Sequence, residues 1–163
     1  MNTDYQKLKS SFEKLLPKLK EMNDEYNELF KNDEEFEPLF RIESSSEKEI
    51  LDLEHHIQSS IIEPYRSFIK DYNPSIEISC DGRGVRLLGI KEMKEEFDNT
   101  YEFKELLSEN IFPIALDGSG NYFVVKTEKE NQFIYWINHD KDFSLSLEGK
   151  FIDIMIKWIE EEL

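Results

Sequence analysis

The spacing of apolar residues changes at Pro74, and this change restricts the fold more than any other feature of the chain. Before Pro74, apolar residues recur at intervals of three and four, which is the spacing of one helix face. After it, short apolar or alternating stretches are separated by Gly, Asn and Asp, as in strands joined by turns. Helical and extended elements in separate blocks predict an α+β fold with a mainly antiparallel sheet packed with helices.

The first 40 residues carry the most regular helical pattern. Its apolar positions are Tyr5, Leu8, Phe12, Leu15, Leu19, Met22, Tyr26 and Leu29. They predict a helix over residues 5–29 with one buried side. Pro17 interrupts it, and an interior proline costs about 3 kcal/mol, so we expect a kink or a break into two helices near Leu16. The flanking positions lack the complementary charges of a coiled coil, so this segment is expected to pack on its own domain.

Two further helices are predicted before Pro74. Ser46 and Glu49 have the spacing of a capping box, so a helix is expected to begin near Glu47. Pro64 suits the first turn of a second helix, which Pro74 would follow. No segment is a linker long enough to divide two domains, and 163 residues is close to the usual size of one domain. We therefore expect a single domain over residues 1–163, with an N-terminal helical segment (1–40) and a core (46–163).

The part of the chain after Pro74 predicts a sheet of short strands. Residues 91–107 are helix-prone, with an interruption at residues 98–100. The expected strands cover residues 76–80, 85–90, 111–116, 122–127, 132–138 and 143–147. Their close spacing favours a β-meander, and residues 150–162 return to helical spacing and predict a closing helix.

The turn Asp117-Gly118-Ser119-Gly120-Asn121 joins two of these strands. Oxygen-bearing side chains at positions 1, 3, 5 and 12 of the stretch beginning at Asp117 partly match a calcium-binding loop. However, Tyr122 stands where that loop requires glycine, and residues 122–125 are predicted to form a strand. A hairpin turn is the favoured interpretation, with no metal and no cofactor.

Composition restricts the class of partner. Formal net charge is −16, so attraction to nucleic acid or to an anionic membrane is disfavoured and a basic protein partner is favoured. A single cysteine, Cys80, allows no internal disulfide and fits a reducing compartment. The N-terminus lacks a basic region followed by an apolar run, and no stretch approaches 18 consecutive apolar residues. A cytoplasmic location is expected.

Two local patterns resemble the SUKH superfamily, which is named partly for the yeast Smi/Knr cell-wall regulators. Residues 65–73 are similar to the family's helix with Tyr, Phe-Leu and Tyr-Asn at the same spacings. Residues 112–123 are similar to its strand, Asp-Gly-Ser/Thr-Gly turn and following strand, and Trp136 with His139 and Asp140 resembles what often follows. The resemblance covers about residues 46–163 and implies a single α+β domain.

For function, the resemblance implies a protein that is not an enzyme. Bacterial members are typically immunity proteins that neutralise toxins, often nucleases or other nucleic-acid-directed enzymes with basic clefts. A regulatory protein-binding scaffold, as in the eukaryotic branch, is the alternative within the family. A small hydrolase that uses an unrecognised carboxylate pair is the alternative from another class, and two convergent, partly buried carboxylates in one pocket would identify it.

Contact residues are predicted from charge and from position near the loops of the sheet. Exposed acids and aromatic anchors are expected to meet a cognate toxin or another basic protein, with the chain acting as a monomer or a weak homodimer. The predicted contact residues are Asp81, Asp117, Asp140 and Asp142, with Tyr101 and Trp136 as anchors.

Overall fold

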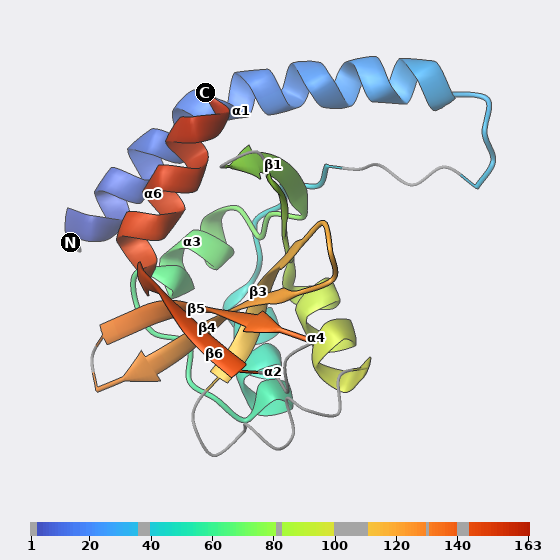
Figure 1. Ribbon diagram of the computed structural model, residues 1–163. Coiled ribbons are helices and arrows are strands. Elements are labelled where there is room, and N and C mark those ends of the chain that lie inside the picture. The colour runs from blue at the N-terminus through green and yellow to red at the C-terminus, as the bar shows by residue number, and fades with distance from the viewer. Residues whose placement is uncertain (1–2, 36–39, 81–82, 100–110, 130, 140–143) are drawn as a thin grey trace.

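In the computed structural model, an antiparallel sheet of six strands forms the centre of the fold (Figure 1). The structure describes residues 3–35, 40–80, 83–99, 111–129, 131–139 and 144–163. The strands lie side by side in the order in which they occur along the chain, so the sheet is a meander, as predicted. They are β1 (Ile76–Cys80), β2 (Arg83–Leu87), β3 (Ile111–Asp117), β4 (Tyr122–Glu128), β5 (Asn131–Asn138) and β6 (Ser144–Lys150).

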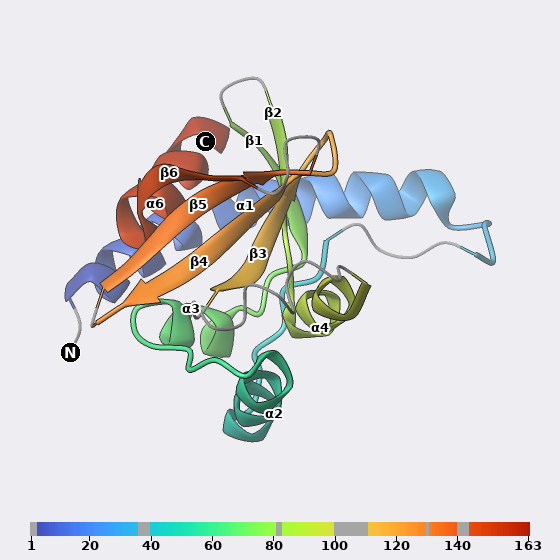
Figure 2. The ribbon, with the colours of Figure 1, turned by 60° about the horizontal axis from the view of Figure 1, so that its bottom comes forward.

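Helices cover the sheet from two sides. Those described are α1 (Thr3–Phe30), α2 (Glu47–Ile57), α3 (Tyr65–Asp71), α4 (Ile90–Asn99) and α6 (Phe151–Glu162). Helix α6 contacts β1, β5 and β6 and also packs against α1, so it lies between the sheet and the N-terminal helix. Figure 2 shows α2 and α4 on the other side of the sheet from α6. The α+β class predicted from the sequence is confirmed.

Aromatic side chains join these elements into one hydrophobic cluster. Phe12 of α1 meets Phe68 of α3 with ring centroids 5.1 Å apart. Tyr65 of α3 contacts Phe151 of α6 at 5.2 Å, and its hydroxyl lies 3.1 Å from the sulfur of Met93 in α4. All five side chains belong to the buried cluster. The helices and the sheet therefore share a core.

Local sequence signals account for the starts of several elements. Ser46 accepts a hydrogen bond from the backbone N–H of Glu49, and the Glu49 side chain accepts one from the backbone N–H of Ser46, so the predicted capping box begins α2. Pro64, expected in the first turn of the second helix, is the residue just before α3, at the N-cap position. Helix α4 occupies the first part of the helix-prone stretch, and residues 100–110 lie outside the described residues.

Helix α1 continues through Pro17 rather than breaking there. It is one helix of 28 residues with Pro17 inside it, and Figure 1 shows it changing direction about halfway along. The expected kink is therefore present, and the alternative of two separate helices is wrong.

The predicted apolar side of α1 is only partly buried. Its buried residues, from Tyr5 to Leu19, all lie in the first part of the helix. Farther along, Met22 and Leu29 are 36% and 79% exposed. The second half of α1 extends beyond the rest of the molecule, as both views show (Figures 1 and 2).

Candidate partner-binding surface

The turn between β3 and β4 is built around the carboxylate of Asp117. One carboxylate oxygen accepts hydrogen bonds from the backbone N–H groups of Ser119 and Asn121, at 2.8 and 2.9 Å. The other accepts from the Asn121 amide and from the indole N–H of Trp136, both at 3.0 Å. Gly120 has a φ of +80°, a conformation that favours glycine. The side chain of Asp117 therefore fixes the shape of the turn.

These hydrogen bonds lower the pKa of the Asp117 carboxyl. Burial by itself raises that pKa, but the bonds from Asn121, Trp136 and Ser119 stabilise the charged form and outweigh burial, so the pKa lies below its ordinary value. Asp117 is thus held as a carboxylate whose oxygens are directed at donors of its own domain.

Asn121 links this turn to the end of β5. Its amide donates to Asp117, whose carboxylate can only accept, so the amide oxygen of Asn121 must face the other way. That oxygen lies 2.7 Å from Nδ1 of His139 and accepts a hydrogen bond from the His139 backbone N–H at 3.1 Å. Nδ1 of His139 therefore carries the proton in this arrangement. The network brings Asp117, Asn121, Trp136 and His139 together.

The structure places two of the six predicted contact residues and joins them to each other. Asp117 ends β3 and Trp136 lies on β5, so their hydrogen bond reaches across β4. Trp136 is half-buried and packs against the hydrophobic core. The other predicted contact residues, Asp81, Tyr101, Asp140 and Asp142, lie outside the described residues.

A polar pocket of about 440 Å³ lies between the start of α4, β2 and the residues just before β1, and two of its lining residues, Arg86 and Glu92, form an ion pair. Arg86 donates to Glu92 at 2.6 Å and to the hydroxyl of Ser75 at 3.1 Å. The side-chain oxygen of Asn73 accepts from the backbone N–H of Ile90 at 2.7 Å, at the start of α4. These contacts hold the N-terminus of α4 against the β1–β2 hairpin, so we assign the pocket a structural role.

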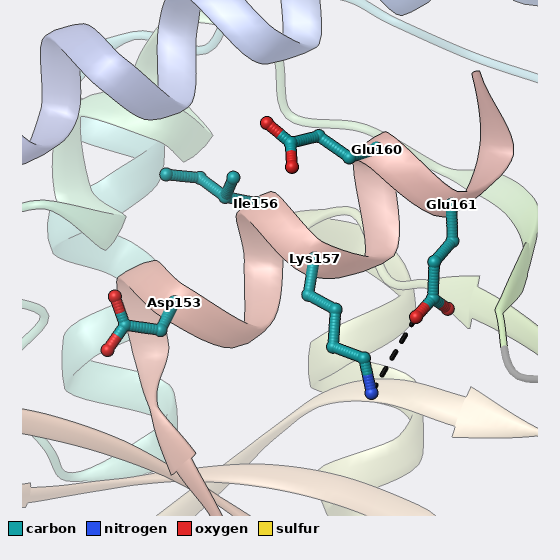
Figure 3. Close-up of a pocket in the computed structure, with 5 residues that line it drawn as sticks. All are labelled: Asp153, Ile156, Lys157, Glu160 and Glu161. Atoms are coloured by element: carbon teal, nitrogen blue, oxygen red, sulfur yellow. Dashed lines mark ion pairs between the residues drawn. The ribbon is translucent and has the colours of Figure 1, made fainter.

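The outward side of α6 is an acidic surface that the sequence analysis did not single out. A shallow groove of about 380 Å³ there is lined by Asp153, Lys157, Glu160 and Glu161, together with Ile156 (Figure 3). Lys157 pairs with Glu161 at 3.6 Å. Figure 3 shows Glu160 pointing away from that pair, toward the side on which α1 lies. The signal in the sequence was the run of three acids that ends this amphipathic helix.

The described acidic residues give little support to the alternative of a hydrolase that uses a pair of carboxylates. Asp153 and Glu160 lie on one side of α6 but two helical turns apart, so this groove does not bring their carboxylates together (Figure 3). The hydrogen bond from Arg66 lowers the pKa of Glu47, and the hydrogen bonds from Ser46 lower that of Glu49. A general acid requires a shift in the opposite direction. Within the described ranges, no three or more His, Cys, Asp or Glu side chains gather in a way that could hold a metal ion.

The described helices also bear on membrane association. None of them combines the length and the apolar character that crossing a bilayer requires.

Comparison with known families matched residues 44–157 to the SMI1/KNR4 family, SUKH-1. Searches of curated proteins and of solved structures each found no match. The matched range contains α2, α3, α4, the whole sheet and the network around Asp117, and α1 precedes it. Since the match extends over more than half of the sequence, the chain belongs to the SMI1/KNR4 (SUKH-1) family.

Proposed function

We propose that this chain is a non-enzymatic immunity protein that binds and neutralises a cognate bacterial toxin in the cytoplasm, without a cofactor. The observation that carries the proposal is membership of the SUKH-1 family over residues 44–157. Bacterial members of this superfamily typically serve as immunity proteins. The residues that the structure describes add a folded domain with acidic exposed surfaces, such as the outward side of α6.

Charge supports a basic toxin as the partner. The formal net charge of −16 would draw a basic protein toward the chain at long range and repel nucleic acid. A toxin that acts on nucleic acid has a basic cleft, and an acidic inhibitor could occupy the place of the substrate. Binding would then block the toxin without chemistry on the part of the inhibitor.

The loops of the sheet stay a prediction for the contact surface. Asp81, Tyr101, Asp140 and Asp142 are proposed to face the toxin. Asp117 has a different part in this proposal, because its oxygens already accept four hydrogen bonds within the domain. It would shape the turn next to the contact surface, and Trp136 would support it from β5.

Co-expression tests the proposal directly. The chain is produced together with a candidate toxin domain chosen from the genes next to its own, and growth is compared with that of cells producing the toxin domain alone. We expect growth to be restored and the two proteins to co-purify. Continued growth arrest despite a folded, soluble chain would contradict the proposal. Co-purification with a non-toxic cellular protein instead would favour the regulatory scaffold.

A further inference from the structure

The second half of α1 and the turn after it form a projecting segment, residues 21–35, which we call the arm. None of its residues is buried, whereas the first half of the helix contributes Leu8, Phe12 and Leu15 to the core. The ten helical residues of the arm extend about 15 Å at 1.5 Å per residue. Figures 1 and 2 show this half reaching past the sheet and the other helices.

The two halves of α1 differ in charge. Residues 3–20 contain five lysines and two acids, whereas the arm contains seven acids and one lysine, Lys31. The lysine-rich half is tied to the body, for example by Lys18, whose ammonium lies 3.3 Å from Glu162 of α6. The arm therefore concentrates negative charge, net −6 from seven acids and one lysine, on the part that leaves the body.

The charge of the arm is unfavourable for the helix that carries it. A helix has partial negative charge at its C-terminus, and acids there are repelled. Helix α1 has no basic residue in its last turn, where Glu28 lies. Packing, which normally supplies most of the stability of a helix in a protein, is weak here because no side chain of the arm is buried. A positively charged partner would relieve this repulsion.

Apolar side chains accompany the charges. Leu29 is 79% exposed, Phe30 39% and Met22 36%. The rings of Tyr26 and Phe30 lie 4.6 Å apart and form a small aromatic platform. Exposed apolar side chains surrounded by charge are typical of protein interaction sites.

A groove lies at the base of the arm, between α1 and the segment that precedes α2. It has a volume of about 630 Å³. Its apolar lining consists of Leu16, Pro17, Leu19, Phe40 and Ile42. Asn23 also lines it. The groove therefore offers space for an apolar side chain.

These features select a basic protein over other occupants. Two copies that met through their arms would bring together two segments of net charge −6, on chains that each carry −16 overall. Charge repulsion therefore disfavours self-association. Nucleic acid and anionic membranes are repelled for the same reason. A protein surface with Lys or Arg around a protruding apolar side chain matches the acids, the platform and the groove together.

We propose that the arm and the groove at its base form a docking surface for the toxin in addition to the loops of the sheet, and that the toxin is a basic protein that places an apolar side chain in the groove. This inference rests on the proposed immunity function. It also assigns the surface to a part of the chain before the family match, which begins at residue 44. Contacts outside the shared fold would let one family member recognise its own toxin.

The test compares two charge variants of the full chain, each lacking four carboxylates. The arm variant carries Glu21→Gln, Asp24→Asn, Glu25→Gln and Glu28→Gln. The control carries Asp52→Asn, Glu77→Gln, Glu128→Gln and Glu148→Gln, all exposed and all outside the arm. Glu28 and Glu128 each pair with a lysine, so the sets are matched in that respect as well.

The probe is the purified toxin domain used in the co-expression experiment. At low salt, we expect the association rate constant of the arm variant to fall about tenfold or more, and that of the control to change about twofold at most. Leu29→Ala should raise Kd about five- to tenfold. Leu51→Ala, which truncates an exposed leucine of α2, should leave Kd within about twofold.

The outcomes separate this inference from the function on which it rests. If the wild-type chain fails to bind the toxin, the proposed function is wrong and the docking surface falls with it. If the wild-type chain binds but the arm variants bind equally well, the function stands and the arm is not a docking surface. Sedimentation velocity adds a further check, because a wild-type dimer that Leu29→Ala dissociates would make the arm a self-association surface and overturn the inference.

Discussion

Asp117 gathers donors from its own turn and from a strand two positions across the sheet. Its carboxylate accepts from Ser119, Asn121 and Trp136, and Asn121 in turn contacts His139. The turn, the strand tryptophan and the histidine are features by which the sequence resembles the SUKH superfamily. In the structure they form one hydrogen-bonded network, so the resemblance has a physical basis in the shape of this turn.

Removal of the Asp117 side chain should destabilise the domain. Asp117→Ala leaves the donors of Asn121 and Trp136 without their acceptor, and hydrogen bonds to a charged group contribute about 1.5–3 kcal/mol each at most. Because the site is half-exposed, we expect a loss of about 2–3 kcal/mol in the free energy of unfolding, measured by urea denaturation. Ser119→Ala, at an exposed position of the same turn, should change it by less than about 0.5 kcal/mol. Equal effects of the two substitutions would contradict the assigned role.

The network should also make stability depend on pH in the acidic range. The folded-state pKa of Asp117 lies below its ordinary value. The ionised group therefore stabilises the fold fully above the unfolded pKa of about 3.9, and this contribution disappears as pH falls through the folded pKa. The stability difference between wild type and Asp117→Asn should be constant above about pH 5 and shrink below about pH 4. Urea denaturation at several pH values measures this difference in the free energy of unfolding. A difference that grows as the pH falls would contradict the lowered pKa of Asp117.

The sequence alone could indicate the turn but not all of its contacts. Asp, Gly and Asn between two extended stretches predict a hairpin with good reason. The hydrogen bond between Asp117 and Trp136 depends on the relative register of β3, β4 and β5, and no local pattern specifies that register across three strands.

At the scale of elements, α2 shows a local signal that works as expected. Ser46 and Glu49 exchange hydrogen bonds at its N-terminus, with distances of 3.2 and 2.7 Å. Ser46→Ala should therefore lower the free energy of unfolding by about 1 kcal/mol, since an N-cap typically contributes about 0.5–2 kcal/mol. Thermal unfolding measures the loss. Ser44→Ala, at an exposed position outside the helix, is the matched control, and no difference between the two would argue against the cap.

Helix α1 shows where periodicity stops being informative. The apolar spacing continues from Tyr5 to Leu29, yet burial ends at Leu19. Periodicity reports which side of a helix is apolar, but the extent of burial depends on how far the rest of the domain reaches along it. The helical block was therefore predictable, and the exposed arm was not. The separation of lysines and acids along α1 was a signal in the sequence that marked the boundary.

Truncation of a side chain should destabilise the domain strongly in the first half of α1 and hardly at all in the second half. Phe12 is fully buried, and its ring contacts those of Phe68 and Tyr72. Phe12→Ala should cost about 3–5 kcal/mol of stability, as large-to-small core substitutions do. Leu29→Ala should change stability by less than about 0.5 kcal/mol, because the side chain is exposed. Urea denaturation of both variants would refute the assignment of the arm if Leu29→Ala were strongly destabilising.

At the scale of the whole molecule, the apolar pattern of the sequence accounts for the fold, and the net charge accounts for the class of partner. The SUKH-1 core provides a sheet covered by helices, and its residues follow the apolar patterns of the sequence. Net charge does not determine that fold, but it determines which partners approach it. The charges are unevenly placed, with a lysine-rich half of α1 against the body and an acid-rich arm that extends away from it. The molecule thus presents negative charge where it is open to a partner.

Inhibition of the purified toxin domain tests the central claim most directly. The toxin's activity on its substrate is titrated with the purified chain at low and at high ionic strength. The account predicts that activity falls to zero at a fixed molar ratio, and that the association rate constant decreases steeply as salt is added. Full toxin activity in the presence of excess folded chain would contradict the proposed function. Complete inhibition at a rate insensitive to salt would contradict the role assigned to the acidic surface.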